Sequence, residues 1–241
     1  MTTRISAKNL AALNMEDACP RCFWIKNKCK IPYSIFPGIF STLDKYSKEI
    51  VQAWFEKTGG MPPWLPQLMN TTAILKAPHW KKFQRLDPVT GITLSGTPDL
   101  YLETATGAHI IPDLKTAKIT ENADRLRPLY VGQLNGYRWI DEGFGFTVLS
   151  TPLIYCEPVA LADTIGVDSV LTSIGFMMGF KTQQVEIEHD PHLIHRLLAK
   201  AKDILDMGSP PAGADNCKDC EALDTILCAC DAHPAANSQA D

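Results

Sequence analysis

The sequence predicts a mixed α/β or α+β fold in one large domain. Its 241 residues are 45% hydrophobic and 21% charged, which is enough apolar material to bury a core and excludes a disordered chain or a small disulfide scaffold. Between residues 92 and 156, segments follow in the order strand, strand, helix, strand. We expect a single domain at residues 1–230. The Ala, Asn, Ser and Gln residues of the C-terminus indicate a flexible tail at 231–241.

Apolar residues at helical spacing predict three helices, at residues 40–57, 121–141 and 191–207. Gly59 and Gly60 end the first. A strand is predicted at 92–103, interrupted at 96–98, and a turn at 104–107 leads into a second strand at 108–115, so that the two form a hairpin. Further strands are predicted at 146–156, 174–180 and 183–188.

No segment has the pattern of a membrane span or a secretory signal. The longest weakly polar stretches, 143–156 and 169–180, are shorter than a bilayer-spanning helix. The N-terminus has neither a long apolar core nor a small-residue cleavage site. We therefore expect a cytoplasmic protein with no membrane partner.

Eight cysteines in a reducing compartment favour metal ligation over disulfides. Two CxxC pairs, Cys19 with Cys22 and Cys217 with Cys220, can supply four thiolates to one metal ion or cluster and join the chain ends. The alternatives are a redox-active pair at 19–22, a structural zinc site, an iron–sulfur cluster, and unligated core cysteines. Cys156 lies in a strand-like run and is interpreted as a small buried hydrophobe.

Charge is distributed unevenly behind the net charge of -4. Residues 1–40 hold six basic and two acidic side chains, whereas residues 201–241 hold two basic and eight acidic ones. A second basic cluster is interleaved with aromatic residues, which suits a nucleic-acid backbone and its bases, although a solvated helix face is the commoner meaning. The cluster consists of Lys76, His79, Trp80, Lys81, Lys82, Phe83 and Arg85.

Three polar residues on the predicted hairpin carry the chemistry. Asp113 and Lys115 project to the same side of one strand, and pairing with the other strand brings Asp99 beside them. Two carboxylates suit a hard divalent cation, and the lysine can orient a water or stabilise charge on a phosphate, which implies phosphodiester hydrolysis. An internal ion pair is the alternative. Gln133 and Tyr137, at i and i+4 of the following helix, share one face and can reach the same pocket.

The segments GTPDL at 96–100, PDLKTAK at 112–118 and QLNGY at 133–137 resemble, in order and spacing, the PD-(D/E)XK nuclease superfamily. The RecB-like branch, which includes CRISPR-associated and AddB-type iron–sulfur exonucleases, is the most similar because of the terminal cysteines. The resemblance implies a restriction-endonuclease-like mixed central sheet flanked by helices. It also implies N- and C-terminal segments joined by a cysteine-ligated cluster.

Residue roles follow from this resemblance. Asp99, Asp113 and the carbonyl of Leu114 would bind Mg²⁺ or Mn²⁺, Lys115 would position the attacking water, and Gln133 and Tyr137 would support the site. Many relatives add a ligand from the first core helix, where this chain offers Asp44 or Glu49. A 4Fe–4S cluster would take one early and three late cysteines. The candidates are Cys19, Cys22, Cys217, Cys220, Cys228 and Cys230, with Zn²⁺ as the alternative to the cluster.

These features together predict a metal-dependent DNA nuclease. We expect an exonuclease that favours single-stranded ends, acting in DNA repair, recombination, or CRISPR or phage defence, with protein partners in such a complex. The alternatives are a non-catalytic DNA-binding or assembly module that retains the fold, and a metal-stapled α/β protein of other function.

Overall fold

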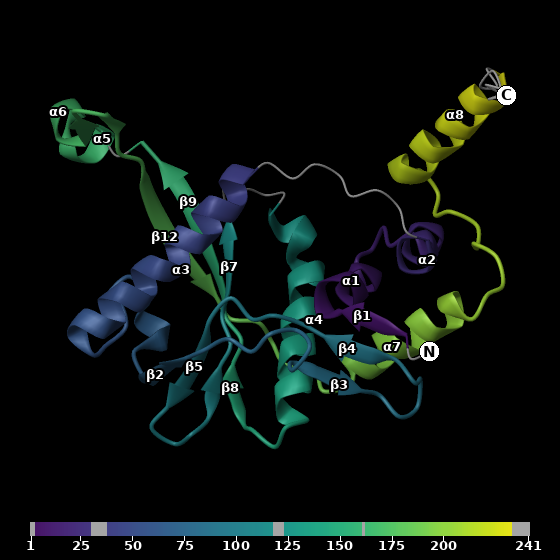
Figure 1. The fold of residues 1–241 in the computed structure, drawn as a ribbon, viewed down its shortest axis with the longest axis horizontal. Coiled ribbons are helices and arrows are strands. Elements are labelled where there is room, and N and C mark those ends of the chain that lie inside the picture. Colours follow the sequence, from purple (N-terminus) through teal and green to yellow (C-terminus); the bar gives the residue numbers. More distant parts are fainter. Residues whose placement is uncertain (1–2, 30–37, 118–122, 161, 233–241) are drawn as a thin grey trace, which may run out of the picture.

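Two long helices, α3 (Gly38–Thr58) and α4 (Ala123–Glu142), lie near the centre of the molecule, and the sheet that contains β1, β3 and β4 lies on the side of α4 away from α3 (Figure 1). The structure, a computed structural model, describes residues 3–29, 38–117, 123–160 and 162–232. The helices are α1 (Ala7–Ala11), η1 (Ala12–Asn14), α2 (Pro20–Lys28), α3 (Gly38–Thr58), η2 (Pro66–Leu68), α4 (Ala123–Glu142), α5 (Ala162–Ile165), α6 (Val167–Val170), α7 (Leu193–Leu205) and α8 (Lys218–Ala232). The strands are β1 (Arg4–Ser6), β2 (Thr71–Leu75), β3 (Gln84–Leu86), β4 (Thr93–Ser95), β5 (Tyr101–Thr104), β6 (His109–Ile110), β7 (Asp113–Thr116), β8 (Val148–Ser150), β9 (Leu153–Val159), β10 (Leu171–Thr172), β11 (Gly175–Phe176) and β12 (Gly179–Val185).

The layered arrangement follows from the alternation of side chains along the strands. Ile154 and Cys156 of β9 pack with Leu114 of β7 and Val51 of α3. The intervening Leu153 and Tyr155 belong to the apolar cluster that includes α4. Since successive strand residues face opposite sides, α3 covers one face of this sheet and α4 the other. The mixed α/β class predicted from the sequence is confirmed.

The strands form three sheets, in the orders β1-β4-β3, β2-β5-β6-β8 and β12-β9-β7, and β10 with β11 makes a small separate pair. The antiparallel pair of β5 and β6 confirms the predicted hairpin around the turn at 104–107. Beyond it, β7 runs parallel to β9, with Asp113 opposite Leu153.

The strand predicted at 92–103 does break at the predicted interruption, but its two parts, β4 and β5, belong to different sheets. β4 pairs with β1 and β3, and β5 begins only at Tyr101, so Asp99 lies in a bend rather than on a strand. Pro98 lacks the N–H that a ladder needs, and Gly96 packs no side chain, which explains why the strand stops. The prediction that Asp113 and Lys115 share the hairpin with Asp99 is wrong. The hairpin consists of β5 and β6, whereas β7, which carries Asp113 and Lys115, belongs to another sheet.

Helices α3, α4 and α7 confirm the three predicted helices within a few residues, whereas α1, α2 and α8 were not predicted. The strand predicted at 146–156 is two strands, β8 and β9, separated at Thr151 and Pro152. The strand predicted at 174–180 is divided between β11 and the start of β12, and the one predicted at 183–188 falls partly in β12.

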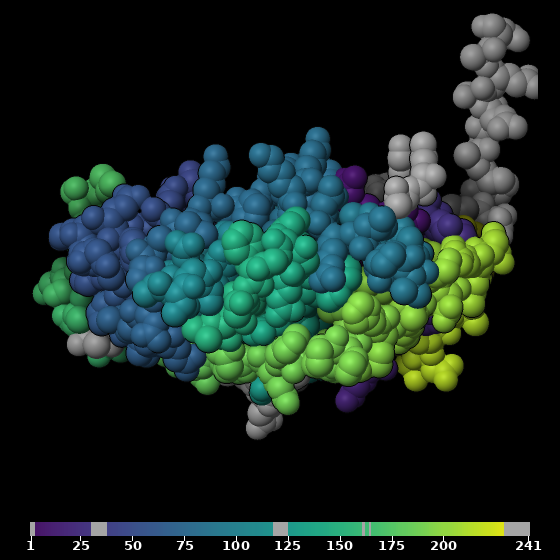
Figure 2. Space-filling model, turned by 90° about the horizontal axis from the view of Figure 1, so that it is seen from below, coloured from purple at the N-terminus to yellow at the C-terminus, as the bar shows by residue number. Residues whose placement is uncertain are grey.

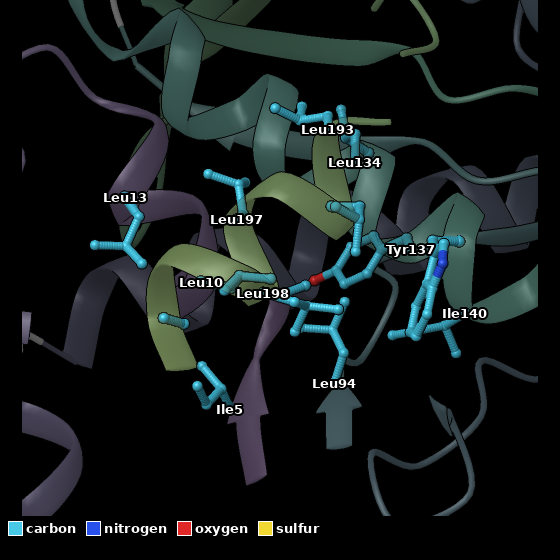
Figure 3. Packing of buried hydrophobic residues seen from close by; sticks show 14 of the residues in the cluster. Ile5, Leu10, Leu13, Leu94, Leu134, Tyr137, Ile140, Leu193, Leu197 and Leu198 are labelled. Carbon is cyan, nitrogen blue, oxygen red and sulfur yellow. The ribbon is translucent and has the colours of Figure 1, made fainter. Parts of the chain in front are cut away.

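The larger apolar cluster joins the N-terminal segment to α4 and α7. Figure 3 shows Ile5, Leu10 and Leu13 packed with residues of α7 such as Leu197 and Leu198, with Leu134 and Tyr137 of α4 beside them. Tyr137 is therefore both a core residue and a candidate site residue.

The two chain-terminal segments lie at one end of an elongated molecule, and the region of α5 and α6 lies at the other (Figures 1 and 2). No helix of the described residues is long and apolar enough to cross a membrane. Of the predicted tail, Asp231 and Ala232 belong to α8, and residues 233–241 lie outside the described part of the chain.

Candidate active site and candidate metal centre

The structure brings Asp99, Asp113 and Lys115 together although Asp99 comes from a bend and the other two from β7. The backbone N–H of Leu114 donates a hydrogen bond to Oδ2 of Asp99 over 3.0 Å. Nζ of Lys115 lies 2.5 Å from Oδ2 of Asp113. The Leu114 amide thus holds the Asp99 carboxylate against the strand that carries the other two residues.

Asp113 is almost fully buried, with 2% of its surface exposed. Burial raises the pKa of Asp113, the Lys115 ammonium opposes this, and the Asp99 carboxylate raises it again, to about 6 overall. The two carboxylates are therefore close enough to disfavour each other's charge, and the site attracts cations.

Gln133 and Tyr137 of α4 complete this group from the other side. Nε2 of Gln133 donates to Oδ1 of Asp113 and to the Tyr137 hydroxyl, each over 2.9 Å. The Tyr137 hydroxyl donates to the carbonyl of Thr97 over 3.1 Å. The five side chains predicted from the sequence are connected in one network, here called the carboxylate site: Asp99, Asp113, Lys115, Gln133 and Tyr137.

Gly96, in the GTPDL segment, makes this close packing feasible. A Cβ at this position would lie 2.4 Å from Cε1 of Tyr137, closer than non-bonded carbons approach. Because Tyr137 is buried, its ring has little room to move away. Gly96 therefore allows the backbone before Asp99 to lie directly against α4.

Lys48 of α3 is a site residue that the sequence did not predict. Its Nζ lies 2.7 Å from Oδ1 of Asp99 and 2.7 Å from Oδ2 of Asp44. Burial lowers the pKa of Lys48, but the Asp99 and Asp44 carboxylates outweigh this and raise it. Of the two upstream acids left open, Asp44 reaches the carboxylate site through Lys48, whereas Glu49 pairs with the exposed Lys45.

The donor atoms of the carboxylate site suit a hard divalent cation. Asp99 and Asp113 offer carboxylate oxygens, which Mg²⁺ and Mn²⁺ prefer, and such ions keep several waters when few protein ligands are present. Three or more Cys, His, Asp or Glu ligand atoms do not converge here, since within the described part of the chain the one such group is formed by cysteines. The carboxylate site therefore offers two acidic ligands at most, with an ammonium beside each.

The two CxxC pairs meet at the chain ends. Cys19 immediately precedes α2 and Cys22 lies in it, while Cys217 precedes α8 and Cys220 lies in its first turn. Sγ of Cys19 is 3.5 Å from Sγ of Cys220, and Sγ of Cys22 is 3.6 Å from those of both Cys217 and Cys220. All four sulfurs lie within 4.8 Å of one another, so the group can hold a metal ion or cluster.

Among the cysteines whose side chains the structure describes, the other three stand apart from this cysteine centre. Cys228, further along α8, is exposed and outside the group, and Cys29 is also exposed. Cys156 is buried in β9, as predicted. The side chain of Cys230 lies outside the described residues. Among the described sulfurs, two early and two late cysteines gather, whereas the resemblance implied one early and three late ones.

Polar contacts support the cysteine centre. Burial raises the pKa of Cys19, but hydrogen bonds from the backbone amides of Cys22 and Ala214 outweigh it and lower the pKa to about 6. A thiolate therefore forms at neutral pH. Arg21 donates two hydrogen bonds to Asp224, over 3.0 and 2.8 Å, so part of the charge asymmetry between the chain ends is an ion pair across them.

The basic and aromatic cluster is a loop, not a helix face, and its two ends lie beside residues that flank Asp99. It leaves β2 at Leu75, whose partner in β5 is Tyr101, and it ends at Phe83, whose carbonyl accepts from the Gly96 amide. The four exposed basic side chains are Lys76, His79, Lys81 and Lys82.

Two arginines contact aromatic rings in or near this cluster. The Arg4 guanidinium lies over the Trp80 ring, 4.8 Å from its centroid. Arg85 instead stacks on Trp139 and donates to its carbonyl, so its role is structural.

Comparisons with known proteins add little to this geometry. No protein-family model matches the sequence, and no curated protein matches it. Among solved structures, the crystal structure of SSO0001 matches with a TM-score of 0.41 and 12% sequence identity, over 88% of this chain and 80% of that chain. A similarity of this degree does not establish a shared fold.

Proposed function

We propose that the protein is a Mg²⁺- or Mn²⁺-dependent DNA nuclease, an exonuclease that favours single-stranded ends. The observation that supports this best is the convergence of Asp99, Asp113, Lys115, Gln133 and Tyr137 from three separate segments. An internal ion pair needs only Asp113 and Lys115, and it has no use for the rest. The biological setting proposed is DNA repair, recombination, or CRISPR or phage defence.

The side chains have distinct roles in this proposal. A divalent cation held by Asp99, Asp113 and the Leu114 carbonyl would act as a Lewis acid on the scissile phosphate. Burial lowers the pKa of Lys115, but Asp113 and Asp99 outweigh this and raise it, so the amine stays protonated. Lys115 would therefore donate a hydrogen bond to the attacking water and stabilise phosphate charge, rather than remove a proton. Gln133 holds Asp113 in position from α4.

DNA is proposed as the substrate because of the loop at residues 76–82. The two ends of this loop lie beside Tyr101 and Gly96, on either side of Asp99, so a phosphate backbone held by its exposed lysines would lead toward the carboxylate site. The overall charge of -4 does not oppose this, since the local potential governs binding.

Two cofactors compete for the cysteine centre. The resemblance implies a 4Fe–4S cluster. The sulfur separations of 3.5 and 3.6 Å instead favour one Zn²⁺, whose tetrahedral thiolate ligands lie about 3.8 Å apart. A cluster would require the four sulfurs to spread. Visible absorbance of anaerobically purified protein near 400 nm supports the cluster, and colourless protein with one equivalent of zinc supports the ion.

Nuclease assays test the proposed function. End-labelled single- and double-stranded DNA, with circular single-stranded DNA as a test for the need of an end, should be cut in the presence of Mg²⁺ or Mn²⁺. Lys115→Ala should reduce the rate about a hundredfold or more, as loss of one charge-stabilising donor does. Lys45→Ala, an exposed lysine away from the site, is the matched control. Wild-type protein that binds DNA without cutting it would instead indicate the non-catalytic binding module.

A further inference from the structure

The Leu114 amide contacts one oxygen of the Asp99 carboxylate, and the Lys48 ammonium contacts the other, which is the oxygen that could bind a metal. Oδ2 of Asp99 accepts the hydrogen bond of the Leu114 amide, and Oδ1 is the atom that Lys48 contacts at 2.7 Å. A divalent ion at Oδ1 would lie about 2.1 Å from it, and an ammonium at the same oxygen would repel that ion.

We propose that Lys48 is a tethered cation that competes with the divalent metal for Asp99 and thereby sets the metal affinity of the carboxylate site. This inference rests on the proposed function, because it takes Asp99 as a metal ligand. In this proposal Lys48 determines metal affinity and is not a catalytic residue.

Asp44 gives Lys48 a second partner to which it can withdraw. The two residues are one helical turn apart on α3, and Oδ2 of Asp44 already lies 2.7 Å from Nζ. The Asp44 side chain is 43% exposed, against 18% for Asp99, so withdrawal moves the ammonium toward solvent without leaving it unpaired. Displacement of the Lys48 ammonium from Asp99 by a metal therefore costs little free energy.

The charge balance of the site points in the same direction. Three carboxylates, of Asp44, Asp99 and Asp113, face two ammoniums, of Lys48 and Lys115. Without Lys48, the group carries one more uncompensated negative charge, and a divalent cation is bound more tightly.

Titration with Mn²⁺ in the absence of DNA tests this, with the free ion followed by its electron paramagnetic resonance signal. Lys48→Met in the full chain should lower the Kd for Mn²⁺ about tenfold or more. Lys45→Met should change it less than about twofold, because the Lys45–Glu49 pair has the same helical spacing but lies away from the site. Lys48→Gln should behave as Lys48→Met, and Lys48→Arg should stay near wild type. These two variants also serve if the apolar substitution impairs folding, which circular dichroism would show.

Asp113→Asn separates failure of this inference from failure of the proposed function. If it abolishes Mn²⁺ binding while Lys48→Met and Lys48→Gln bind no more tightly than wild type, the competition is overturned and the carboxylate site stands. If Mn²⁺ binding does not depend on Asp113, or is absent from the wild type and all variants, the site is not a metal site and both proposals fall.

Discussion

Each acid of the carboxylate site has its own lysine. Asp113 pairs with Lys115 of the same strand, and Asp99 pairs with Lys48 of α3. The two pairs differ in burial, because Asp113 is enclosed and Asp99 lies nearer to solvent. A buried carboxylate costs free energy unless it is compensated, so Asp113 is the residue whose charge depends most on its surroundings.

Metal binding should weaken in acid because of Asp113. Its pKa is raised to about 6, so below that pH the carboxyl is increasingly protonated, neutral, and a poor ligand. The affinity for Mn²⁺ should therefore fall between pH 7 and pH 5, by up to about tenfold per pH unit below the pKa. Titrations across this range measure it. An affinity that stays constant down to pH 5 would contradict the assignment of Asp113 as a ligand.

At the scale of elements, helical periodicity was the most informative feature of the sequence. α4 and α7 each place an apolar face on the core, whereas α3 shows the same helical pattern but buries only Val51 and leaves Tyr46, Ile50 and Trp54 exposed. α8 was not predicted, and Cys220 is the one buried side chain among those of α8 that the structure describes. Its place is defined by Cys217, Cys220 and the Arg21–Asp224 pair, which are long-range contacts.

The site residues were predictable, but their arrangement was not. Asp99 and Asp113 meet through a bend and a parallel pair between β7 and β9, and local alternation does not reveal such long-range pairing. The sequence could not identify Lys48 as a site residue, because α3 contains two ion pairs at i and i+4 spacing. These are Asp44 with Lys48 and Lys45 with Glu49. The spacing is the same in both, and only the rotation of the helix about its axis decides which pair faces the site.

Gly96→Ala should show how tightly β4 and its following bend pack against α4. The added methyl would overlap the buried Tyr137 ring, so we expect a loss of about 1–3 kcal/mol in the free energy of unfolding. Urea denaturation measures this. Gly60→Ala is the matched control, since a methyl there meets nothing within 4 Å, and it should change stability by less than about 0.5 kcal/mol. Equal stability of the two variants would refute the close contact.

At the scale of the whole molecule, the cysteine centre and the Arg21–Asp224 pair join segments from the two ends of the chain. Cys22 and Cys217 are separated by 195 positions, so a bound metal closes a loop that includes the carboxylate site. In the loop-closure account, cross-links around loops of this length stabilise by on the order of 5 kcal/mol when they restrict the unfolded chain. The exposed Arg21–Asp224 pair contributes far less, so a metal bound by the cysteines would be the stronger of the two connections.

Loss of the cysteine centre should therefore lower the stability of the whole molecule and not only of its ends. Cys220→Ser replaces the most buried of the four ligands, and we expect loss of the bound metal and a Tm lower by on the order of 10 °C. Cys228→Ser is the matched control, because this cysteine lies on the same helix but is exposed and outside the group. It should retain the metal and the wild-type Tm. Calorimetry with metal analysis measures both quantities.

If Cys228→Ser loses the metal and Cys220→Ser keeps it, the ligand set is wrong. If Cys220→Ser loses the metal with no change in Tm, the centre does not stabilise the fold.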